Sequence, residues 1–476
     1  MSREVFFKNL EISAAPLEIY RALGPRSPRV LLESARTGGT QGRYSLAGSD
    51  PSLVFQFKNG RATVHLRGKK KRIIAGDPVL ILKKMLLDHR VRLRPGFPPF
   101  AGGAVGFVGY EAKKLFEPTL TQKAREDLNL PWMYFIFLEE GALFDHKKGK
   151  LFLFCVRKNS ASAKACLLSL EKKILKNLRS KPKQKSFHSG KTPVSSVTRK
   201  QFLAMVQNAK EHIRRGDIFQ ANLSQRLTFP LRSSAEDIYE NLKKVNPSAF
   251  FGIFDTGEFQ ILSGSPERLL KLEGRDLETR PIAGTRSRSR DLKKDQVASR
   301  ELLLNEKERA EHLMLVDLER NDLGRVAEYG SVRVDEFMVV EDYSHVKHIV
   351  SSVRAKLKKN LHALDAFCAF FPGGTITGAP KVRAMQIIDN LEPVARGPYT
   401  GSLGYFSFTG AMDFNIIIRS LVVKDGYAHL QVGAGIVADS DPQKEYEETL
   451  YKAEALLTAV YGVERTRAIL RKFKFS

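Results

Sequence analysis

The stretch AHLQVGAGIVADSDPQKEYEETLYKAEALLTAVY, residues 428–461, contains a strand, a glycine-rich turn and a helix in direct succession. The run AHLQVGAG (428–435), with apolar residues, two polar ones and two glycines, favours a strand. From about Pro442 to Tyr461 the apolar residues recur at helical spacing, and the proline occupies a first helical position. The rest of the chain shows how such strands and helices alternate.

Strands and helices follow one another elsewhere without strict strand–helix–strand alternation. Short β-rich runs such as SLVFQFK, ATVHL and KLFLFCV dominate the first part. Later, helices at about 199–216, roughly 291–323 and KVRAMQIIDNL (381–391) are separated by strand-like runs. This pattern predicts an α+β protein with large, mostly antiparallel sheets.

The polar segment 182–198, rich in Lys, Ser, Pro and Thr, has no hydrophobic period and predicts a linker or a long surface loop. It separates a sheet-rich N-terminal region, 1–181, from a second region, 199–465, which is followed by a basic tail, 466–476. The chain has 476 residues, a length that favours two or three units.

The formal net charge of +26 raises the possibility of a polyanion partner. Much of the excess lies in runs such as GKKKR (68–72), without interleaved aromatic residues and without a zinc-finger or helix-turn-helix pattern. A solvated basic surface is therefore the better interpretation, and nucleic acid is an unlikely partner.

No window approaches eighteen unbroken apolar residues, so we expect no membrane span. The first residues, MSREVFFKNLEIS, do not resemble a signal peptide. Cys155, Cys166 and Cys368 lack metal-ligand spacing, and an odd number of cysteines suits a reducing cytoplasm. We therefore expect a cytoplasmic protein.

Two E-x-x-E pairs are candidate metal ligands. Glu308 and Glu311 form one pair, and Glu445 and Glu448 form the other. Residues three apart share a helix face, so each pair can direct two carboxylates to one point. Four converging carboxylates need a hard cation, and Mg²⁺ accepts oxygen ligands while keeping water sites for a substrate. Alone, either pair is more often exposed helix surface.

The residues around these pairs also fit an anion site. The glycines of GAGIVADS (433–440) let the backbone approach a ligand closely. Arg419 interrupts an apolar strand, where it is either paired internally or directed at a carboxylate. His348 lies among apolar residues and is more often a core group than a catalyst. Lys452 follows Glu448 by four residues and can be simply its helix partner.

The loop TRPIAGTRSR (279–288) surrounds an unreactive side chain with anion-binding groups. Its centre is Ala283, and three arginines lie nearby: Arg280, Arg286 and Arg288. Together with the carboxylate pairs, this loop describes the binding of a small polycarboxylate without an obvious nucleophile.

Several motifs occur in an order that resembles the chorismate-utilising enzymes, in particular the synthase subunits that aminate chorismate. They are GDIFQANLSQRL, SPERLL, PIAGTR, ERAEHLMLVDLERNDLGRV, GGTITGAPKVRAM and GAGIVADSDPQKEYEETL, preceded by VLLESARTGGTQGRYSLAG. The resemblance implies one α+β body in which two large, mostly antiparallel sheets face each other, with helices outside and the active site in the cleft.

The resemblance also implies roles for single residues. Mg²⁺ would bridge the ring carboxylate of chorismate to Glu308, Glu311, Glu445 and Glu448. The positions that match the enolpyruvyl side are Tyr399, Arg419, Gly433 and Gly435. Gly284 and Thr285 match the loop at the ring carboxylate. His348 matches a histidine beside the ring, where it is our candidate general acid, and Lys452 matches a lysine near the metal.

Two positions bear on the reaction. Family members that add water carry a lysine where this chain has Gln220, and a lysine can act as a base for water whereas glutamine cannot. Ammonia needs no such base, so Gln220 favours amination. In many aminodeoxychorismate synthases the loop resembles PIKGT, whereas in anthranilate synthases it resembles PIAGT. Ala283 therefore favours anthranilate synthase.

Other stretches favour aminodeoxychorismate synthase component I. The segment NPSAFFGIFD (246–255) differs from the PSPYM-like segment of anthranilate synthases, and SGSPERLLKL, GGTITGAPK and MDFNIIIRSL are also closer to the aminodeoxychorismate branch. We predict that branch, with anthranilate synthase as the alternative. No cysteine lies on a Gly-x-Cys-x-Gly elbow. Ammonia would therefore come from solution or from a separate glutamine amidotransferase subunit.

Overall fold

The computed structural model describes residues 3–34, 42–92, 97–121, 123–179, 191–246, 248–288, 291–342 and 346–475. Within these ranges, two 12-stranded sheets form the body of the molecule, and the strand pairs in both are antiparallel. The predicted α+β class with two large antiparallel sheets is confirmed.

The first sheet, sheet A, combines strands from both ends of the chain. Its strands, in spatial order, are β1 (Glu4–Leu10), β10 (Lys150–Arg157), β9 (Glu140–Asp145), β3 (Tyr44–Ser49), β2 (Arg29–Glu33), β13 (Phe250–Asp255), β14 (Phe259–Ser265), β23 (Ser420–Lys424), β24 (Tyr427–Ile436), β12 (Gln220–Pro230) and β11 (Val194–Ser195), with β20 (Gly378–Ala379) also paired to β12.

The second sheet, sheet B, also combines strands from the N-terminal and C-terminal regions of the chain. Its strands are β17 (Ile282–Ser287), β19 (Val346–Lys356), β16 (Asp276–Thr279), β15 (Arg268–Glu273), β22 (Met412–Ile416), β21 (Ser402–Ser407), β7 (Gly103–Val108), β8 (Met133–Leu138), β4 (Leu53–Lys58), β5 (Arg61–Leu66) and β6 (Arg72–Ile74), with β18 (Arg333–Asp342) also paired to β19.

The two sheets face each other across an aromatic core. Val30 of β2 and Phe254 of β13 pack in one cluster with Phe107 of β7 and Ile136 of β8. The rings of Phe107 and Phe254 lie 6.1 Å apart, edge to face. Burying a phenylalanine side chain contributes about 1.5–3 kcal/mol, so this layer stabilises the contact between the sheets.

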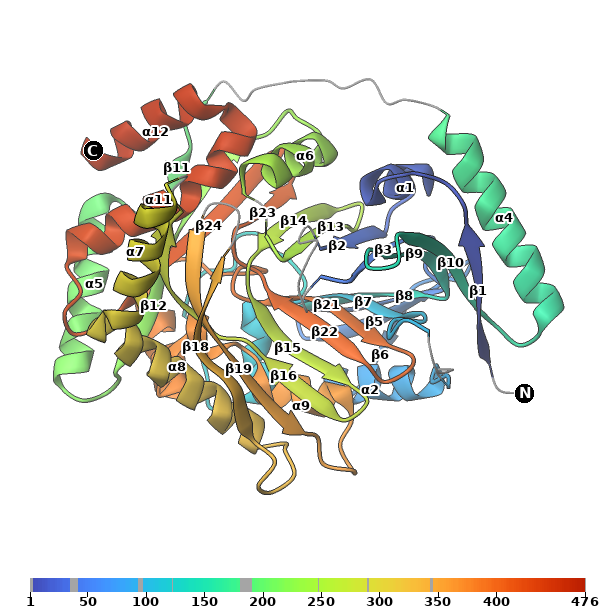
Figure 1. Ribbon diagram of the computed structural model, residues 1–476, viewed down its shortest axis with the longest axis horizontal. Coiled ribbons are helices and arrows are strands. Elements are labelled where there is room, and N and C mark those ends of the chain that lie inside the picture. The colour runs from blue at the N-terminus through green and yellow to red at the C-terminus, as the bar shows by residue number, and fades with distance from the viewer. Residues whose placement is uncertain are drawn as a thin grey trace.

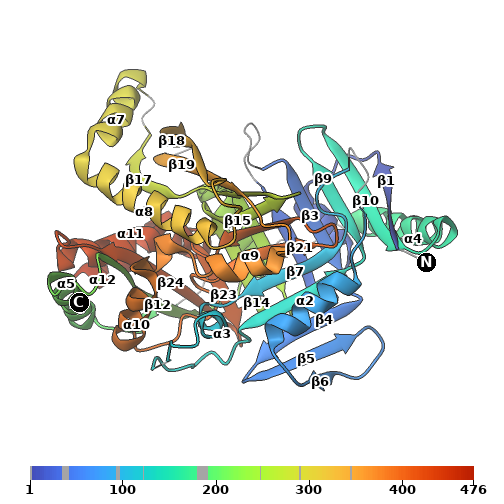
Figure 2. The same ribbon diagram turned by 90° about the horizontal axis from the view of Figure 1, so that it is seen from below.

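Helices cover the outer faces of the sheets (Figures 1 and 2). They are α1 (Pro16–Ala22), α2 (Pro78–Asp88), α3 (Lys113–Phe116), α4 (Ser160–Leu178), α5 (Arg199–Arg214), α6 (Ala235–Val245), α7 (Leu292–Leu304), α8 (Glu306–Gly324), α9 (Ala363–Phe370), α10 (Lys381–Leu391), α11 (Pro442–Tyr461) and α12 (Val463–Phe475), with short 3₁₀ turns η1 (Tyr110–Ala112) and η2 (Gly374–Ile376). Among these helices, none is long and apolar enough to cross a bilayer.

Caps define the two helices that carry the predicted carboxylates. Asn305 accepts a hydrogen bond from the Glu308 amide at 3.0 Å and starts α8, so the predicted helical region over roughly 291–323 consists of α7 and α8. Asp441 caps α11 in the same way, through the Lys444 amide at 2.9 Å. Gly462, with φ of 78°, ends α11 as predicted.

The linker and the tail predicted from the sequence both contribute regular elements to the structure. Residues 182–190 of the expected linker lie outside the described residues, but 194–195 form β11, which pairs with β12. The expected tail, 466–476, belongs almost entirely to α12, whose Ile469 is buried against the helices beside it. The two main regions share both sheets, so they form one body.

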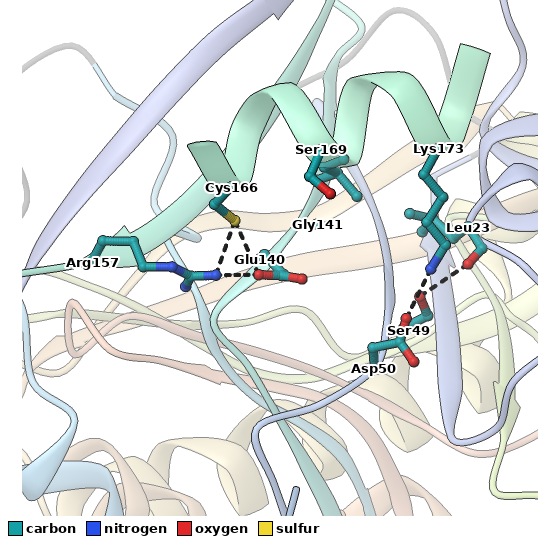
Figure 3. A pocket seen from close by; sticks show the side chains of 10 residues that line it. Leu23, Ser49, Asp50, Glu140, Gly141, Arg157, Cys166, Ser169 and Lys173 are labelled. Atoms are coloured by element: carbon teal, nitrogen blue, oxygen red, sulfur yellow. Dashed lines mark hydrogen bonds and ion pairs between the residues drawn. The ribbon is translucent and has the colours of Figure 1, made fainter. Parts of the chain in front are cut away.

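At the far end of sheet A, α4 contacts the sheet through ion pairs and hydrogen bonds of charged and sulfur-containing side chains (Figure 3). Lys173 pairs with Asp50 at 2.8 Å, and Cys166 contacts Glu140 at 3.1 Å. Arg157 also pairs with Glu140. A cavity of about 340 Å³ opens here, and it shares no lining residue with the site described next.

Candidate active site

A cavity of about 550 Å³ lies where β12 and β24 meet β17, α8 and α11. It brings together most of the residues predicted from the sequence, although they come from distant parts of the chain. The predicted residues on its wall are Gln220, Gly284, Glu308, Glu311, Tyr399, Arg419, Gly433, Gly435, Glu445, Glu448 and Lys452. The motifs therefore share one place in the fold.

The four glutamates enter this cavity from two helices. Glu308 and Glu311 lie on α8, and Glu445 and Glu448 lie on α11. Glu308 pairs with the Arg286 guanidinium at 3.0 Å. Glu448 pairs with the Lys452 ammonium at 2.6 Å. Each helix thus presents one carboxylate that already has a cationic partner.

Arg286 is the loop arginine that reaches these carboxylates. Arg280 instead forms ion pairs with Glu336 and Glu341 of β18. The positive charge of the loop is therefore divided between the cavity and the strand pairing beneath it.

Arg419 and Tyr399 form a cationic and aromatic part of the same cavity wall. Tyr399 is buried, and burial raises the pKa of its hydroxyl, so the phenol stays neutral. Arg419 adopts a positive φ of 51° and donates to the Lys452 carbonyl at 3.1 Å. Burial lowers the pKa of Arg419, but the guanidinium remains charged at neutral pH. This wall can hold a carboxylate or an enol ether oxygen.

Glycines leave the space that a ligand needs. At Gly284, where φ is 62°, a Cβ atom would lie 2.7 Å from Glu308 Oε2. At Gly433 it would lie 2.6 Å from Asn222 Oδ1, and at Gly435 it would lie 2.6 Å from Gln220 Nε2. Any larger residue at these positions would displace a side chain of the cavity wall.

His348 and Thr285 are paired in the strand register behind the cavity. His348 of β19 faces Thr285 of β17, and the His348 Nδ1–H donates to the Gly284 carbonyl at 3.1 Å. Burial lowers the pKa of His348, so its ring is neutral at neutral pH. His348 is not among the described residues on the cavity wall. The Thr285 side chain lies outside what the structure describes.

The two positions that bear on the reaction, Gln220 and Ala283, both line the cavity. Gln220 lies at the first residue of β12, and Ala283 lies on β17 across from it. Neither side chain can accept a proton from water at neutral pH. At these two positions, therefore, the cavity wall carries no base.

Known proteins share this arrangement along nearly the full chain. The family model described as chorismate binding enzyme matches residues 27–458. This chain belongs to the chorismate-binding enzymes. Aminodeoxychorismate synthase component 1 of Bacillus subtilis (strain 168) is 43% identical over 438 residues, which cover 91% of this chain and 92% of that protein. Anthranilate synthase component 1 of Thermus thermophilus is 42% identical over 462 residues, which cover 97% and 98%.

A solved structure supports the same grouping. Anthranilate synthase component I from Streptococcus pneumoniae TIGR4 has a TM-score of 0.77 to this chain at 35% identity, covering 89% of this chain and 94% of that one. The family resemblance inferred from the motifs is thus confirmed, and the chain is a chorismate-utilising enzyme. The two synthase names occur at almost equal identity, so identity alone does not select a product.

The donor set of this chorismate-binding enzyme fits Mg²⁺ by chemistry. Carboxylate oxygens are the hard ligands that the ion prefers, and all four glutamates border the same cavity. Within the described ranges, however, no three acidic, histidine or cysteine side chains already form a metal cluster. The carboxylates of Glu308 and Glu448 would therefore have to exchange their cationic partners, at least in part, for the ion.

One buried acid on the cavity wall was missed by the sequence reasoning. Glu267, the glutamate of the SPERLL motif, is 6% exposed, and its Oε1 has no hydrogen-bond partner among the described residues. Burial raises the pKa of Glu267 to about 7, although Thr375 and Lys452 oppose the shift. A carboxyl with this pKa can donate a proton at neutral pH. The motif itself was the available signal.

A second cavity, of about 510 Å³, opens between the two sheets. Ser34, at the end of β2, lies on its wall, and Phe250 and Phe251 of the NPSAFFGIFD segment lie there too. The Ser34 hydroxyl has no hydrogen-bond partner within the described part of the chain. This space is separate from the carboxylate cavity and shares no lining residue with it.

Proposed function

We propose that this enzyme aminates chorismate in a Mg²⁺-dependent reaction as component I of an aminodeoxychorismate synthase. The product is 4-amino-4-deoxychorismate, a precursor of 4-aminobenzoate and folate. The observation that carries amination is the pair Gln220 and Ala283 on the wall of the carboxylate cavity. Neither residue can activate water, whereas ammonia is a nucleophile without a base.

Chorismate would lie between the carboxylate helices and the cationic wall. Arg419 and Tyr399 would hold the enolpyruvyl side, next to the backbone of Gly433 and Gly435. Glu308, Glu311, Glu445 and Glu448 would hold Mg²⁺. When bound, Mg²⁺ neutralises the ring carboxylate and fixes its position. The backbone around Gly284 would approach the same carboxylate, and the His348 contact to the Gly284 carbonyl keeps that loop in place.

The ring hydroxyl needs a proton in order to leave as water. Glu267 is the group that the geometry favours, because it lies on the cavity wall and is substantially protonated near pH 7. Our prediction that His348 donates this proton is less favoured, since its Nδ1 hydrogen is bound to the Gly284 carbonyl. Ammonia then adds to the ring, at carbon 4 for 4-amino-4-deoxychorismate or at carbon 2 on the anthranilate route.

The second cavity, which Ser34 lines together with the NPSAFFGIFD segment, supports the aminodeoxychorismate branch. Phe250 and Phe251 occupy the wall where anthranilate synthases usually carry the PSPYM-like segment that helps to bind tryptophan. Ala283 favours the alternative, anthranilate synthase, in which ammonia adds at carbon 2 and pyruvate is expelled. With alanine at this position, ammonia would attack the ring directly in either branch.

Ammonia would reach the enzyme from solution or from a separate glutamine amidotransferase subunit. The chain's cysteines are Cys155, Cys166 and Cys368. The Cys166 thiol lowers the pKa of Cys155, but Cys155 is fully buried and out of reach of a substrate. Burial raises the pKa of Cys368, so this thiol is not an activated nucleophile. Cys166 of α4 forms hydrogen bonds with Glu140 and Arg157. The relatives from Bacillus subtilis and Thermus thermophilus are likewise named as component 1 of their synthases.

The deciding experiment incubates the purified protein with chorismate, Mg²⁺ and ammonium at alkaline pH. We expect chorismate to disappear without anthranilate fluorescence, and 4-aminobenzoate to form only after aminodeoxychorismate lyase is added. Anthranilate together with pyruvate would establish the alternative product. Undiminished turnover without Mg²⁺ in the presence of a chelator would contradict the metal assignment, and no turnover of chorismate would contradict amination altogether.

A further inference from the structure

The loop between α5 and β12 presents an aromatic ring to solvent directly beside the candidate active site. Phe219 lies between α5 and β12 and is 70% exposed. Its neighbours point the other way: Ile218 is buried at 2% exposure, and Gln220 lines the carboxylate cavity. The exposed ring is therefore adjacent in the chain to Gln220, a residue of the cavity wall that bears on the reaction.

The loop is held in this conformation by its backbone. Gly216 has a φ of 77°, and the Phe219 amide donates to the Ala379 carbonyl at 2.7 Å. Asp217 accepts from His212 at 2.7 Å and from Arg383 at 3.1 Å. Because both ends of the loop are tied to neighbouring elements, the Phe219 ring cannot turn inward without breaking these bonds.

Single exposed apolar side chains are common on protein surfaces and need no partner to explain them. Phe219 differs because the arginines on the neighbouring helices outnumber the carboxylates that pair with them. Arg214 and Arg215 both pair with the single carboxylate of Glu211, with side chains 76% and 62% exposed. Arg383, 43% exposed, shares Asp217 with His212. Three guanidinium groups thus depend on two carboxylates, which leaves positive charge around an apolar centre.

We propose that Arg214, Arg215, Phe219 and Arg383 form the docking face for the glutamine amidotransferase subunit that supplies ammonia. This inference rests on the proposed amination. A buried aromatic anchor surrounded by charged residues is the usual anatomy of an energetically important interface. The partner would offer an apolar pocket for the ring and an acidic rim for the arginines. Its ammonia outlet would then open next to Gln220.

The test uses this enzyme together with its cognate glutamine amidotransferase subunit. Phe219→Ala and Phe219→Glu are compared with Tyr329→Ala, which removes a fully exposed aromatic ring at another surface position. We expect both Phe219 variants to weaken the complex, measured by calorimetry, by about thirtyfold or more, as is typical for loss of a hot-spot residue. Tyr329→Ala should bind like the wild type.

Activity provides the second readout. At limiting partner concentration, glutamine-dependent amination should fall with the affinity, whereas ammonium-dependent amination should stay unchanged because Phe219 is outside the cavity wall. Wild-type affinity in Phe219→Glu, or the absence of any complex with the wild-type chain, would overturn the inference. Loss of ammonium-dependent activity in the Phe219 variants with unchanged affinity would overturn it too. A wild-type chain that binds the partner but never aminates chorismate contradicts the proposed function alone.

Discussion

At the scale of single residues, Glu267 connects burial to a measurable pH dependence. The pKa of this carboxyl lies near 7 in the folded enzyme because burial disfavours the charged form. The protonated acid therefore predominates below about pH 7 and is lost as the pH rises through that value. We expect the turnover rate, divided by the concentration of free ammonia, to decrease as the pH rises, with an apparent pKa near 7. Steady-state kinetics in ammonium buffers of varied pH measure this directly.

The matched variants are Glu267→Gln and Glu278→Gln. Glutamine at 267 cannot donate a proton of comparable acidity, so the ammonia-corrected rate should fall by about 10²- to 10⁴-fold and lose its step near pH 7. Glu278 pairs with Arg268 and Arg354 outside the cavity, and its variant should keep the pH profile. A step near pH 7 that persists in Glu267→Gln would assign the proton to another group, with His348 the next candidate.

Local sequence patterns predicted some of the site residues and their contacts but missed others. The E-x-x-E spacing placed Glu308 and Glu311, and then Glu445 and Glu448, on helix faces that border one cavity. The spacing also indicated the pair of Lys452 with Glu448, which the structure confirms. The sequence did not indicate that Arg286 pairs with Glu308, because this contact depends on how the elements pack. Glu267 was missed for a similar reason, since its raised pKa comes from burial and leaves no mark on spacing.

At the scale of the elements, the N-cap of α8 links helix stability to the carboxylates. Asn305 both caps α8 and borders the cavity, one turn before Glu308. We expect Asn305→Ala to lower the free energy of unfolding by about 0.5–2 kcal/mol and to fray the turn that carries Glu308. The Mg²⁺ concentration required for half-maximal turnover should rise. Urea denaturation and Mg²⁺ titration of the rate measure the two effects.

A cap on another helix separates stability from function. Asn159 caps α4 through the Ser162 amide at 2.9 Å, far from the carboxylate cavity. Asn159→Ala should cost a similar free energy of unfolding without changing the Mg²⁺ requirement. Asn305→Ser, which retains a capping oxygen, should restore most of both quantities. An unchanged Mg²⁺ requirement in Asn305→Ala would show that the cap does not position the carboxylates.

Helix boundaries were predictable where the chain supplies strong signals. The helix at Lys381–Leu391 and the one at Pro442–Tyr461 have the expected bounds, because prolines and periodic apolar residues define them. The long helical region expected over roughly 291–323 is present, and the cap at Asn305 divides it into two helices. Beyond 465, the basic residues hid the apolar side of α12, where Ile469 packs against other helices.

At the scale of the whole molecule, each sheet joins strands from both sides of the segment 182–198. In sheet A, β2 pairs with β13, and in sheet B, β7 pairs with β21. Sequence composition showed a polar segment between two regions but not which strands would pair across it, because pairing depends on long-range register. Three of the large hydrophobic clusters draw residues from both regions, so neither region can unfold without exposing the apolar surface of the other.

This shared core predicts a single cooperative transition that Phe107 controls. Phe107 is fully buried between the sheets and contacts both Phe254 and Phe259. We expect Phe107→Ala to reduce the free energy of unfolding by about 3–5 kcal/mol. Tyr427→Ala, at a 48% exposed position, should stay within about 0.5 kcal/mol of the wild type. Trp132, the chain's one tryptophan, reports on the N-terminal region by fluorescence, while ammonium-dependent activity reports on the cavity. Both signals should be lost at the same urea concentration in wild type and variant. If Trp132 fluorescence changes well before activity does, the two regions unfold separately and the interleaved sheets do not couple them.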